Sequence, residues 1–392
     1  MQHEKMDPVI LGERLRASRE AASITQADAA SQLDMARTTL VAIEKGQRKV
    51  KFLELKKMAA LYKTTMNGLL REESIHVDLV PRFRRQISSH ITIGEQAADL
   101  MSQLAKAEIE LENLLGVERS KNYPPERSLL PGNVERQAEE DAAELRHWLG
   151  LGQGPIHDIV SLLEFDLGVR LYIRKLDSRI SGLFAYDDTL GACILLNGNH
   201  PRDRRKMTAA HELGHLVATR RMPEVLFEDD PQTSREEKYA NAFARSFLMP
   251  SRSILQKFQE VTSGATQFTR RHVIILAHTF GVSRQLIIHR LEELKAVKKG
   301  TWDWFHMNGG ISDEQAKEVL GELFLSPRDQ AGADIPTTIR LNSLVCQAWQ
   351  QELLSEGQLS QLLNIDYHEL REILDTNELD GSDADDAPTL FG

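Results

Sequence analysis

Two histidines placed four residues apart constrain this chain more than any other feature of its sequence. The segment Met207–Leu216 reads M-T-A-A-H-E-L-G-H-L and contains the pattern H-E-x-x-H. In a helix, residues four apart lie on one face, so His211 and His215 could bind one metal ion, while Glu212 lies about 100° round the helix. Two neutral imidazoles suit Zn²⁺, and an adjacent carboxylate can take a proton from a water molecule as that water attacks a carbonyl. The pattern therefore predicts a zinc site that hydrolyses peptide bonds.

A third ligand for such a metal is expected from the next predicted helix, which begins at Ser234 and ends before Pro250. At about 100° per residue, Glu237 shares a helix face with small residues, and such a face can approach a neighbouring helix closely. Gly214 offers a matching gap on the histidine helix, so Glu237 could reach the metal. Ser234-x-x-Glu237 also fits a capping box, which requires no metal. The helix-face argument favours ligation by Glu237.

The length and composition indicate a protein of more than one domain. At 392 residues the chain is too long for a single compact core of ordinary size, so two or three domains are expected. Hydrophobic residues make up 41% and charged residues 27%, as in soluble globular proteins. The chain lacks an apolar run of about 18 residues and starts without a signal-peptide core, so a cytoplasmic protein that does not bind membranes is expected. Cys193 and Cys346 are predicted to be reduced thiols.

Residues 10–72 have the pattern of a small helical domain. Thr25 is a candidate N-cap for one short helix, and a second short helix follows at Arg37–Glu44. Residues 1–75 contain 13 Lys/Arg and 10 Asp/Glu, a net charge of +3, although the whole chain has a net charge of -10. Two short helices joined by a tight turn in a slightly basic domain predict a DNA-binding helix-turn-helix. The alternative is a helical domain that binds another protein.

From residue 135 the pattern changes to mixed helix and strand. Helices are expected at 138–149 and 156–165, and short strands at 168–173, 180–185 and 192–197. The last strand leads into the helix that carries His211, and an edge strand beside that helix would suit an extended peptide substrate. Residues 273–295 form a further helix-turn-helix pattern with Ser283 as N-cap, for which packing inside the domain is favoured over DNA contact.

Two predicted helical segments flank this region. Between residues 97 and 114, apolar residues recur at a 3-4-3-4-3 spacing, which is typical of a short coiled-coil seam. Such a helix would either form a homodimer or pack within its own chain, and both hypotheses are kept. After residue 301 a small unit is expected, with helices at 341–353, 360–363 and 369–374. The acidic tail that follows is predicted to be disordered.

Three short motifs resemble the Cro/repressor-like (XRE) helix-turn-helix family. They are R-L-R-x-x-R-E at Arg14–Glu20, I-T-Q at Ile24–Gln26 and T-L-V-A-I-E-K-G-Q-R at Thr39–Arg48. The resemblance implies that Gln26 touches the DNA backbone and that Arg37, Thr38 and Thr39 face the major groove. Ala36 departs from the family, which usually has Ser or Thr at this capping position.

Two longer motifs closely resemble the ImmA/IrrE family of metallopeptidases. They are T-x-A-H-E-L-G-H-L at Thr208–Leu216 and E-x-x-A-N-x-F-A-x-x-x-L-M-P at Glu237–Pro250. The likeness covers roughly residues 135–295. Members of the family typically cleave or disable a repressor, and many carry an XRE domain at the N-terminus. The resemblance therefore implies two partners, DNA and a repressor or other regulatory protein.

The same resemblance implies roles for individual residues. His211, His215 and Glu237 would ligate zinc, and Glu212 would be the catalytic glutamate. Asn241 matches a position typical of the family, where a hydrogen bond that supports a zinc ligand is expected. An alternative from another class is a DNA-binding repressor or antitoxin-like regulator that uses the peptidase fold as a protein-binding scaffold without cleavage.

These observations predict a multidomain, mainly α-helical protein. It would contain an all-α helix-turn-helix domain, an α+β zincin-like metallopeptidase domain with a small sheet, and a small helical C-terminal unit. The predicted boundaries are 1–75 for the helix-turn-helix domain, 76–134 for a helical connector, 135–300 for the peptidase domain, 301–374 for the C-terminal unit and 375–392 for the acidic tail.

Overall fold

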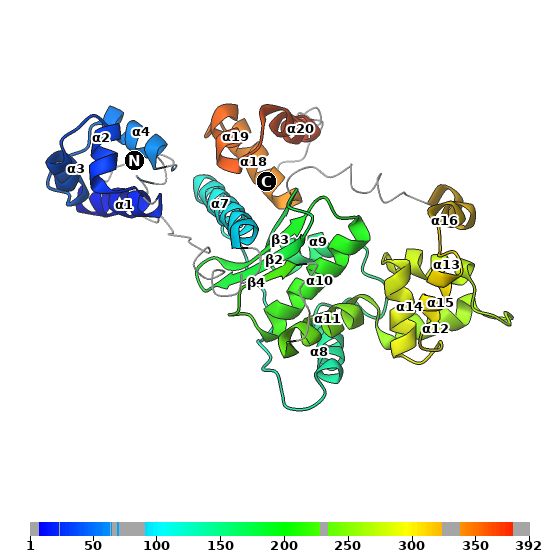
Figure 1. Ribbon diagram of the computed structural model, residues 1–392. Helices are drawn as coiled ribbons and strands as arrows, with labels where there is room; N and C mark the ends of the chain where they lie inside the picture. Colours follow the sequence, from blue (N-terminus) through cyan, green and yellow to red (C-terminus); the bar gives the residue numbers. More distant parts are fainter. Residues whose placement is uncertain are drawn as a thin grey trace, which may run out of the picture. The chain divides into compact units, whose positions relative to one another are not determined.

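The chain forms two compact units, Met1–His76 and Val77–Gly392. The computed structural model describes residues 8–22, 24–62, 64, 69, 91–227, 234–323 and 338–378 (Figure 1). Among these residues, no helix is long and apolar enough to cross a membrane. The acidic tail predicted at 375–392 lies, beyond Glu378, outside the described residues.

The first unit is a bundle of short helices. They are α1 (Pro8–Ala21), α2 (Gln26–Gln32), α3 (Arg37–Glu44) and α4 (Phe52–Leu61). Thr25 caps α2 by accepting a hydrogen bond from the backbone N–H of Asp28, and Asp34 has a left-handed φ of 54° in the turn before α3. A buried ion pair joins Arg19 Nε to Glu44 Oε1 at 2.6 Å and ties α1 to α3. The tight turn between α2 and α3 gives this unit a helix-turn-helix.

The second unit is built around a mixed sheet. Its strands are β1 (Arg170–Arg174), β2 (Ile180–Asp187), β3 (Gly191–Asn197) and β4 (Glu224–Phe227), in the order β1-β3-β2-β4. β1 pairs with β3 in parallel, whereas β2 is antiparallel to both β3 and β4. The sequence predicts the first three strands but not β4, because four residues are too few to show a periodic pattern.

Helix α10 (Arg202–Ala218) crosses one face of this sheet and carries the two histidines. It contacts β2 and β3 on one side and α11 (Arg235–Leu248) on the other, and α8 (Val134–Trp148) packs against α11. Every residue from Thr208 to Ala218 is buried. The helix predicted at 156–165 is shorter: α9 (Ile159–Ser161) passes into a π-helical turn, η1 (Leu162–Asp166). The histidine pair therefore lies inside the core of the unit.

Helices α12 to α16 follow α11. They are α12 (Ser251–Val261), α13 (Arg270–Phe280), α14 (Arg284–Glu293), α15 (Thr301–Met307) and α16 (Asp313–Leu320), with a 3-10 turn η2 at Gly321–Leu323. Gly281 has a left-handed φ of 59° between α13 and α14, and Ser283 caps α14. Arg284 pairs with Asp313, and Arg290 is only 1% exposed. The basic side chains of α14 are thus used in contacts within the unit, which agrees with the predicted packing role.

Helix α7 (Ile91–Leu115) covers the face of the sheet opposite α10 (Figure 1). The hydroxyl of Tyr172 in β1 donates to Glu108 of α7, whereas the neighbouring Leu171 belongs to the core on the α10 side. Two later helices, α18 (Ile339–Gln350) and α19 (Glu356–Leu363), pack against α7, and α20 (Tyr367–Glu378) packs on both of them. Most of the apolar seam of α7 is therefore buried within its own chain, although Leu100 and Leu114 are only half-buried.

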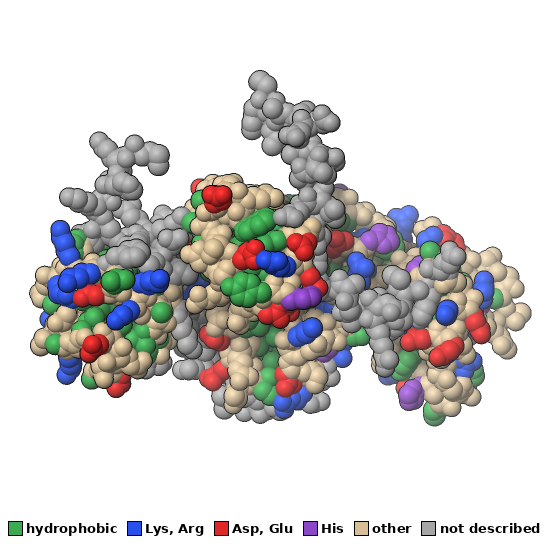
Figure 2. Space-filling view, turned by 90° about the horizontal axis from the view of Figure 1, so that it is seen from above, with side chains coloured by type: hydrophobic (Ala, Val, Ile, Leu, Met, Phe, Trp, Pro, Cys, Tyr) green, Lys and Arg blue, Asp and Glu red, His purple; other side chains and the backbone are tan. Residues whose placement is uncertain are grey.

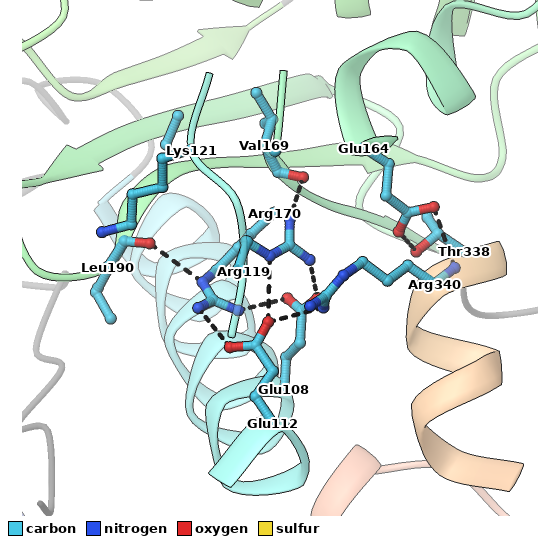
Figure 3. A network of polar contacts seen from close by, with 12 residues as sticks. Glu108, Glu112, Arg119, Lys121, Glu164, Val169, Arg170, Leu190, Thr338 and Arg340 are labelled. Atoms are coloured by element: carbon cyan, nitrogen blue, oxygen red, sulfur yellow. Dashed lines mark hydrogen bonds and ion pairs between the residues drawn. The ribbon is translucent and has the colours of Figure 1, made fainter. Parts of the chain in front are cut away.

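A buried network of charges holds this helical layer to the sheet. Glu108 and Glu112 of α7 face the guanidinium groups of Arg119, Arg170 and Arg340 (Figure 3). Arg170 of β1 lies 2.8 Å from Glu112, and Arg340 of α18 lies 2.7 Å from the same carboxylate. Although burial opposes ionisation of Glu108, Arg119 and Arg170 hold the pKa of its carboxyl below the usual range. Three segments that are distant in sequence are thereby joined by two carboxylates.

Removing one of these carboxylates is expected to destabilise the second unit. Glu108→Ala leaves three buried cations facing one carboxylate, so the free energy of unfolding should fall by about 3–5 kcal/mol. Urea unfolding followed by circular dichroism measures this loss. The matched control is Glu140→Ala, which removes a carboxylate from the exposed pair Arg136–Glu140, whose side chains are 79% and 64% exposed. Equal losses from the two substitutions would contradict the role given to the network.

Candidate metal centre

Three side chains from two helices converge at one point in the second unit. His211 and His215 project from α10, and Glu237 projects from the first turn of α11. The two Nε2 atoms are 3.1 Å apart, and they lie 3.4 Å (His211) and 3.2 Å (His215) from the carboxylate oxygens of Glu237. Among the described residues, this is the one group of three or more His, Cys, Asp or Glu side chains placed to hold a metal ion.

The geometry of this group suits a tetrahedral zinc ion. Zinc binds imidazole nitrogen and carboxylate oxygen at about 2.0–2.2 Å, so atoms at two corners of a tetrahedron around it lie about 3.3–3.6 Å apart. The observed separations of 3.1, 3.2 and 3.4 Å are close to that value. Two imidazoles and one carboxylate would supply three protein ligands, the number typical of catalytic rather than structural zinc sites.

Each imidazole is oriented by a neutral oxygen on its far side. His211 Nδ1 lies 3.2 Å from Asn241 Oδ1, and His215 Nδ1 lies 2.8 Å from Thr219 Oγ1. An Nδ1–H that donates to these oxygens leaves each Nε2 without a proton and directed at the common point. Burial, with the nearby His215, lowers the pKa of His211 to about 4, so its ring is neutral at neutral pH. A neutral imidazole is the form that binds a metal.

The side chain of Glu237 lies at the histidines and does not complete the capping box that Ser234-x-x-Glu237 permits. The backbone N–H of Glu237 donates to Ser234 Oγ at 3.1 Å and so completes the cap of α11. Its side chain lies against the two histidines instead of turning back to the cap. Gly214 on α10 permits this approach, because a Cβ at that position would lie 3.0 Å from Ala240 Cα of α11. Capping and approach to the histidines are compatible, since one uses the backbone and the other the carboxylate.

Glu212 leaves α10 on the side that faces β2. It is 0% exposed, and a Cβ built on Gly182 of β2 would lie 3.2 Å from its Oε1. Thr208, one turn earlier on α10, lies beside the same glycine, with its Cγ2 only 2.6 Å from that Cβ position. The Glu212 carboxylate therefore lies between α10 and β2. Tyr239 of α11 is directed elsewhere, since its hydroxyl lies 2.8 Å from Asp141 Oδ2.

Three residues predicted to contact DNA lie together at the start of α3. Arg37 and Thr38 are exposed and Thr39 is half-buried in the first turn of this helix. Ala36 is the N-cap residue and provides no side-chain hydrogen bond, as its sequence predicts. The arrangement leaves Arg37 accessible to a ligand.

Gln26, the fourth residue predicted to contact DNA, is held against α3. Its Nε2 donates to Glu44 Oε2 at 2.8 Å, and Arg19 Nη2 donates to the same oxygen. Figure 2 shows Lys and Arg side chains on the visible face of the first unit with acidic side chains among them. This mixture agrees with the small net positive charge of residues 1–75, with 13 basic and 10 acidic side chains.

Sequence reasoning misses several residues around the metal centre. Thr219, the C-cap residue of α10, follows His215 by four residues, so its place beside that histidine could be found from helical spacing. Gly182 gives no such signal, because its contact with Glu212 depends on how the helix packs on the sheet. Of the predicted residues, the structure brings Asn241 to His211 and places Glu212 on the opposite side of α10 from α11.

Comparisons with known proteins agree with this architecture. Residues 165–292 match the family model of the IrrE N-terminal-like domain of M78 peptidases, and residues 10–73 match a helix-turn-helix domain. No curated protein is significantly similar to the chain. Among solved structures, the crystal structure of ComR from Streptococcus suis aligns at 10% identity over 96% of each chain, with a TM-score of 0.16. That score is too low to support an argument about the fold.

The fold and the matches define the chain as a helix-turn-helix protein that carries a metallopeptidase-type domain. Its second unit contains an IrrE-like domain of the M78 peptidase family, and its first unit contains a DNA-binding helix-turn-helix domain. These matches confirm the two resemblances seen in the sequence motifs. They also confirm the predicted fold class, a mainly α-helical protein with one small sheet.

Gly214→Ala is expected to weaken metal binding. The added methyl group would lie 3.0 Å from Ala240 Cα and 3.3 Å from Phe243 Cδ1, so α11 must shift by a few tenths of an ångström and carry Glu237 away from the histidines. Zinc affinity, measured by competition with a chelating dye, should fall about 10- to 100-fold. Gly154→Ala is the control, because a Cβ at Gly154 meets nothing within 4 Å. Unchanged affinity in Gly214→Ala would show that the helix spacing does not limit the site.

Proposed function

We propose that the second unit is a zinc-dependent endopeptidase, with zinc held by His211, His215 and Glu237 and with Glu212 as general base. The observation that supports this most strongly is the convergence of the three ligand atoms within 4.8 Å of one another. The Nδ1 partners of both histidines support it further, because they leave both Nε2 atoms directed at that point. The match of residues 165–292 to a peptidase family supports peptide hydrolysis as the reaction.

When bound, the zinc ion would act as a Lewis acid on a substrate carbonyl and make a water molecule easier to deprotonate. Glu212 would take the proton of that water at its carboxylate and deliver it to the leaving amine. Asn241 and Thr219 would hold the two imidazoles in place through the reaction. An extended substrate would pair with β4, which ends the sheet next to β2.

The first unit would direct this activity to particular genes. A helix-turn-helix with Arg37, Thr38 and Thr39 at the start of α3 would read the major groove, and Gln26 would contact the backbone. The resemblance to the ImmA/IrrE family supports a repressor or another regulatory protein as the substrate. The chain would then be a transcriptional regulator that hydrolyses a protein partner in stress, phage or mobile-element control.

A second candidate function is supported by the burial of Glu212. A general base must reach water and substrate, whereas this carboxylate is 0% exposed beneath β2. A protein that only binds its partner needs no such access. The alternative is therefore a DNA-binding repressor or antitoxin-like regulator whose peptidase domain is a binding scaffold.

Glu212→Gln separates the two functions. The amide is nearly the same size as the carboxylate but accepts no proton, so cleavage should fall about 10²- to 10⁴-fold while zinc remains bound. The assay incubates wild type and variant with repressors encoded beside this protein and with the protein itself, and zinc content is measured on the same samples.

Glu236→Gln is the matched control, because it makes the same change on a half-buried neighbour of Glu237 in α11. It should retain both zinc and cleavage. If Glu212→Gln keeps every biological effect of the wild type with zinc bound, the protein is a scaffold and not a peptidase.

Arg37→Ala tests the DNA-binding role of the first unit. Loss of a guanidinium that contacts a base should weaken operator binding by about 10- to 100-fold and relax preference at one base position. Fluorescence anisotropy on an operator selected from random DNA measures both effects. Arg16→Ala removes the same charge from α1, where the side chain is 63% exposed, and should change affinity much less. Equal losses of affinity in Arg37→Ala and Arg16→Ala would mean that operator binding depends only on the net charge of the first unit.

A further inference from the structure

Strand β2 contains an irregularity directly beside the metal centre. Ile180 pairs with Phe227 and Gly182 pairs with Leu226, so Ser181 is an extra residue in a β-bulge. Gly182 follows the bulge at the point where α10 crosses the strand. A glycine inside a strand weakens it and often marks a bulge or a site where another group approaches the backbone closely. Here the approaching groups belong to α10.

The contacts at Gly182 come from one face of α10. A Cβ on this residue would lie 2.6 Å from Thr208 Cγ2, 3.2 Å from Glu212 Oε1 and 3.2 Å from Leu195 O. Thr208 and Glu212 are four residues apart, so they lie one above the other on the helix. No real Cβ fits at 2.6 Å, so any side chain at this position must move the helix or its neighbours.

The metal ligands are anchored on a different side of the same helix. His211 is fixed by Asn241 of α11, and Gly214 packs on Ala240 of α11. The residue Gly214 follows Glu212 by two positions, about 200° round the helix. Helix α10 therefore packs closely on two elements. Its contact with α11 brings Glu237 to the histidines, and its contact with β2 encloses Glu212.

We propose that Gly182 is a positioning residue for Glu212: because Gly182 has no side chain, the space beside it in β2 is free to hold the Glu212 carboxylate. The methyl group that Gly182→Ala adds would displace Glu212 from this space and leave the three metal ligands in place. This proposal rests on the proposed role of Glu212 as general base and adds the residue that fixes its position. Gly182 itself touches no reacting atom.

The test uses acetohydroxamic acid, which chelates zinc through two oxygens and, once bound, donates a hydrogen bond to an adjacent carboxylate. Its affinity therefore reports the position of Glu212 without any peptide hydrolysis. Gly182→Ala and Glu212→Gln should each weaken binding about tenfold, with one zinc per full-length chain retained. The double variant should bind no more weakly than either single variant, because both act on the same contact.

Thr208→Ser separates positioning from packing. It removes the Cγ2 atom that Gly182→Ala would strike, but leaves the new methyl group 3.2 Å from Glu212 Oε1. Gly182→Ala/Thr208→Ser should therefore recover the melting temperature of the wild type but not its affinity for acetohydroxamic acid. Gly198→Ala, where the nearest atoms to a Cβ are 3.4 Å away or more, is the matched control and should behave as wild type.

Several results would overturn the proposal. They are loss of zinc from Gly182→Ala, additive effects of Gly182→Ala and Glu212→Gln, and recovery of affinity by Thr208→Ser. If the single and double variants give the expected affinities but the wild type cleaves no protein, the proposed peptidase function is wrong and Gly182 still positions Glu212. Failure of the wild type to bind zinc or the hydroxamate would overturn both.

Discussion

The close packing of α10 between the sheet and α11 is the constraint on which the candidate metal centre depends. On the α11 side, Gly214 lets Ala240 approach, so Glu237 reaches both histidines. On the sheet side, Gly182 leaves room for Thr208 and Glu212. A side chain at either glycine would force its neighbours to shift, because interiors are packed too tightly to absorb an added methyl group without movement. Two small residues therefore set the spacing of the whole centre.

The opposite face of the sheet is held by charge rather than by small residues. Glu108 and Glu112 of α7 bind guanidinium groups from β1, from the segment after α7 and from the start of α18. Such pairs stabilise a particular arrangement only when every member is matched, since an unpaired buried charge is costly. The network thus joins segments from before and after the peptidase domain into one helical layer. That layer backs the sheet whose other face carries the metal centre.

Local patterns predict much of the fold but not its contacts. The helix that contains H-E-x-x-H, the helix capped by Ser234 and the strands β1 to β3 are all expected from spacing and caps. β4 is missed because it has four residues and gains its hydrogen bonds from β2. The seam of α7 is compatible with a dimer or with internal packing, because apolar spacing identifies a buried face without naming what covers it. Glu108 and Glu112 are paired by arginines of β1 and α18, which are distant in sequence and lie beside α7 only in the folded chain.

The sequence by itself identified the candidate site residues, a resemblance to a peptidase family, and a helix-turn-helix with its cap at Thr25. These features are local, so they can be recognised without knowledge of long-range contacts. The tertiary structure alone decided where the functional groups meet. It placed Glu237 at the histidines, Thr219 and Asn241 behind them, and Glu212 in the space beside Gly182. Those relations depend on packing between elements distant in sequence, which no local pattern records.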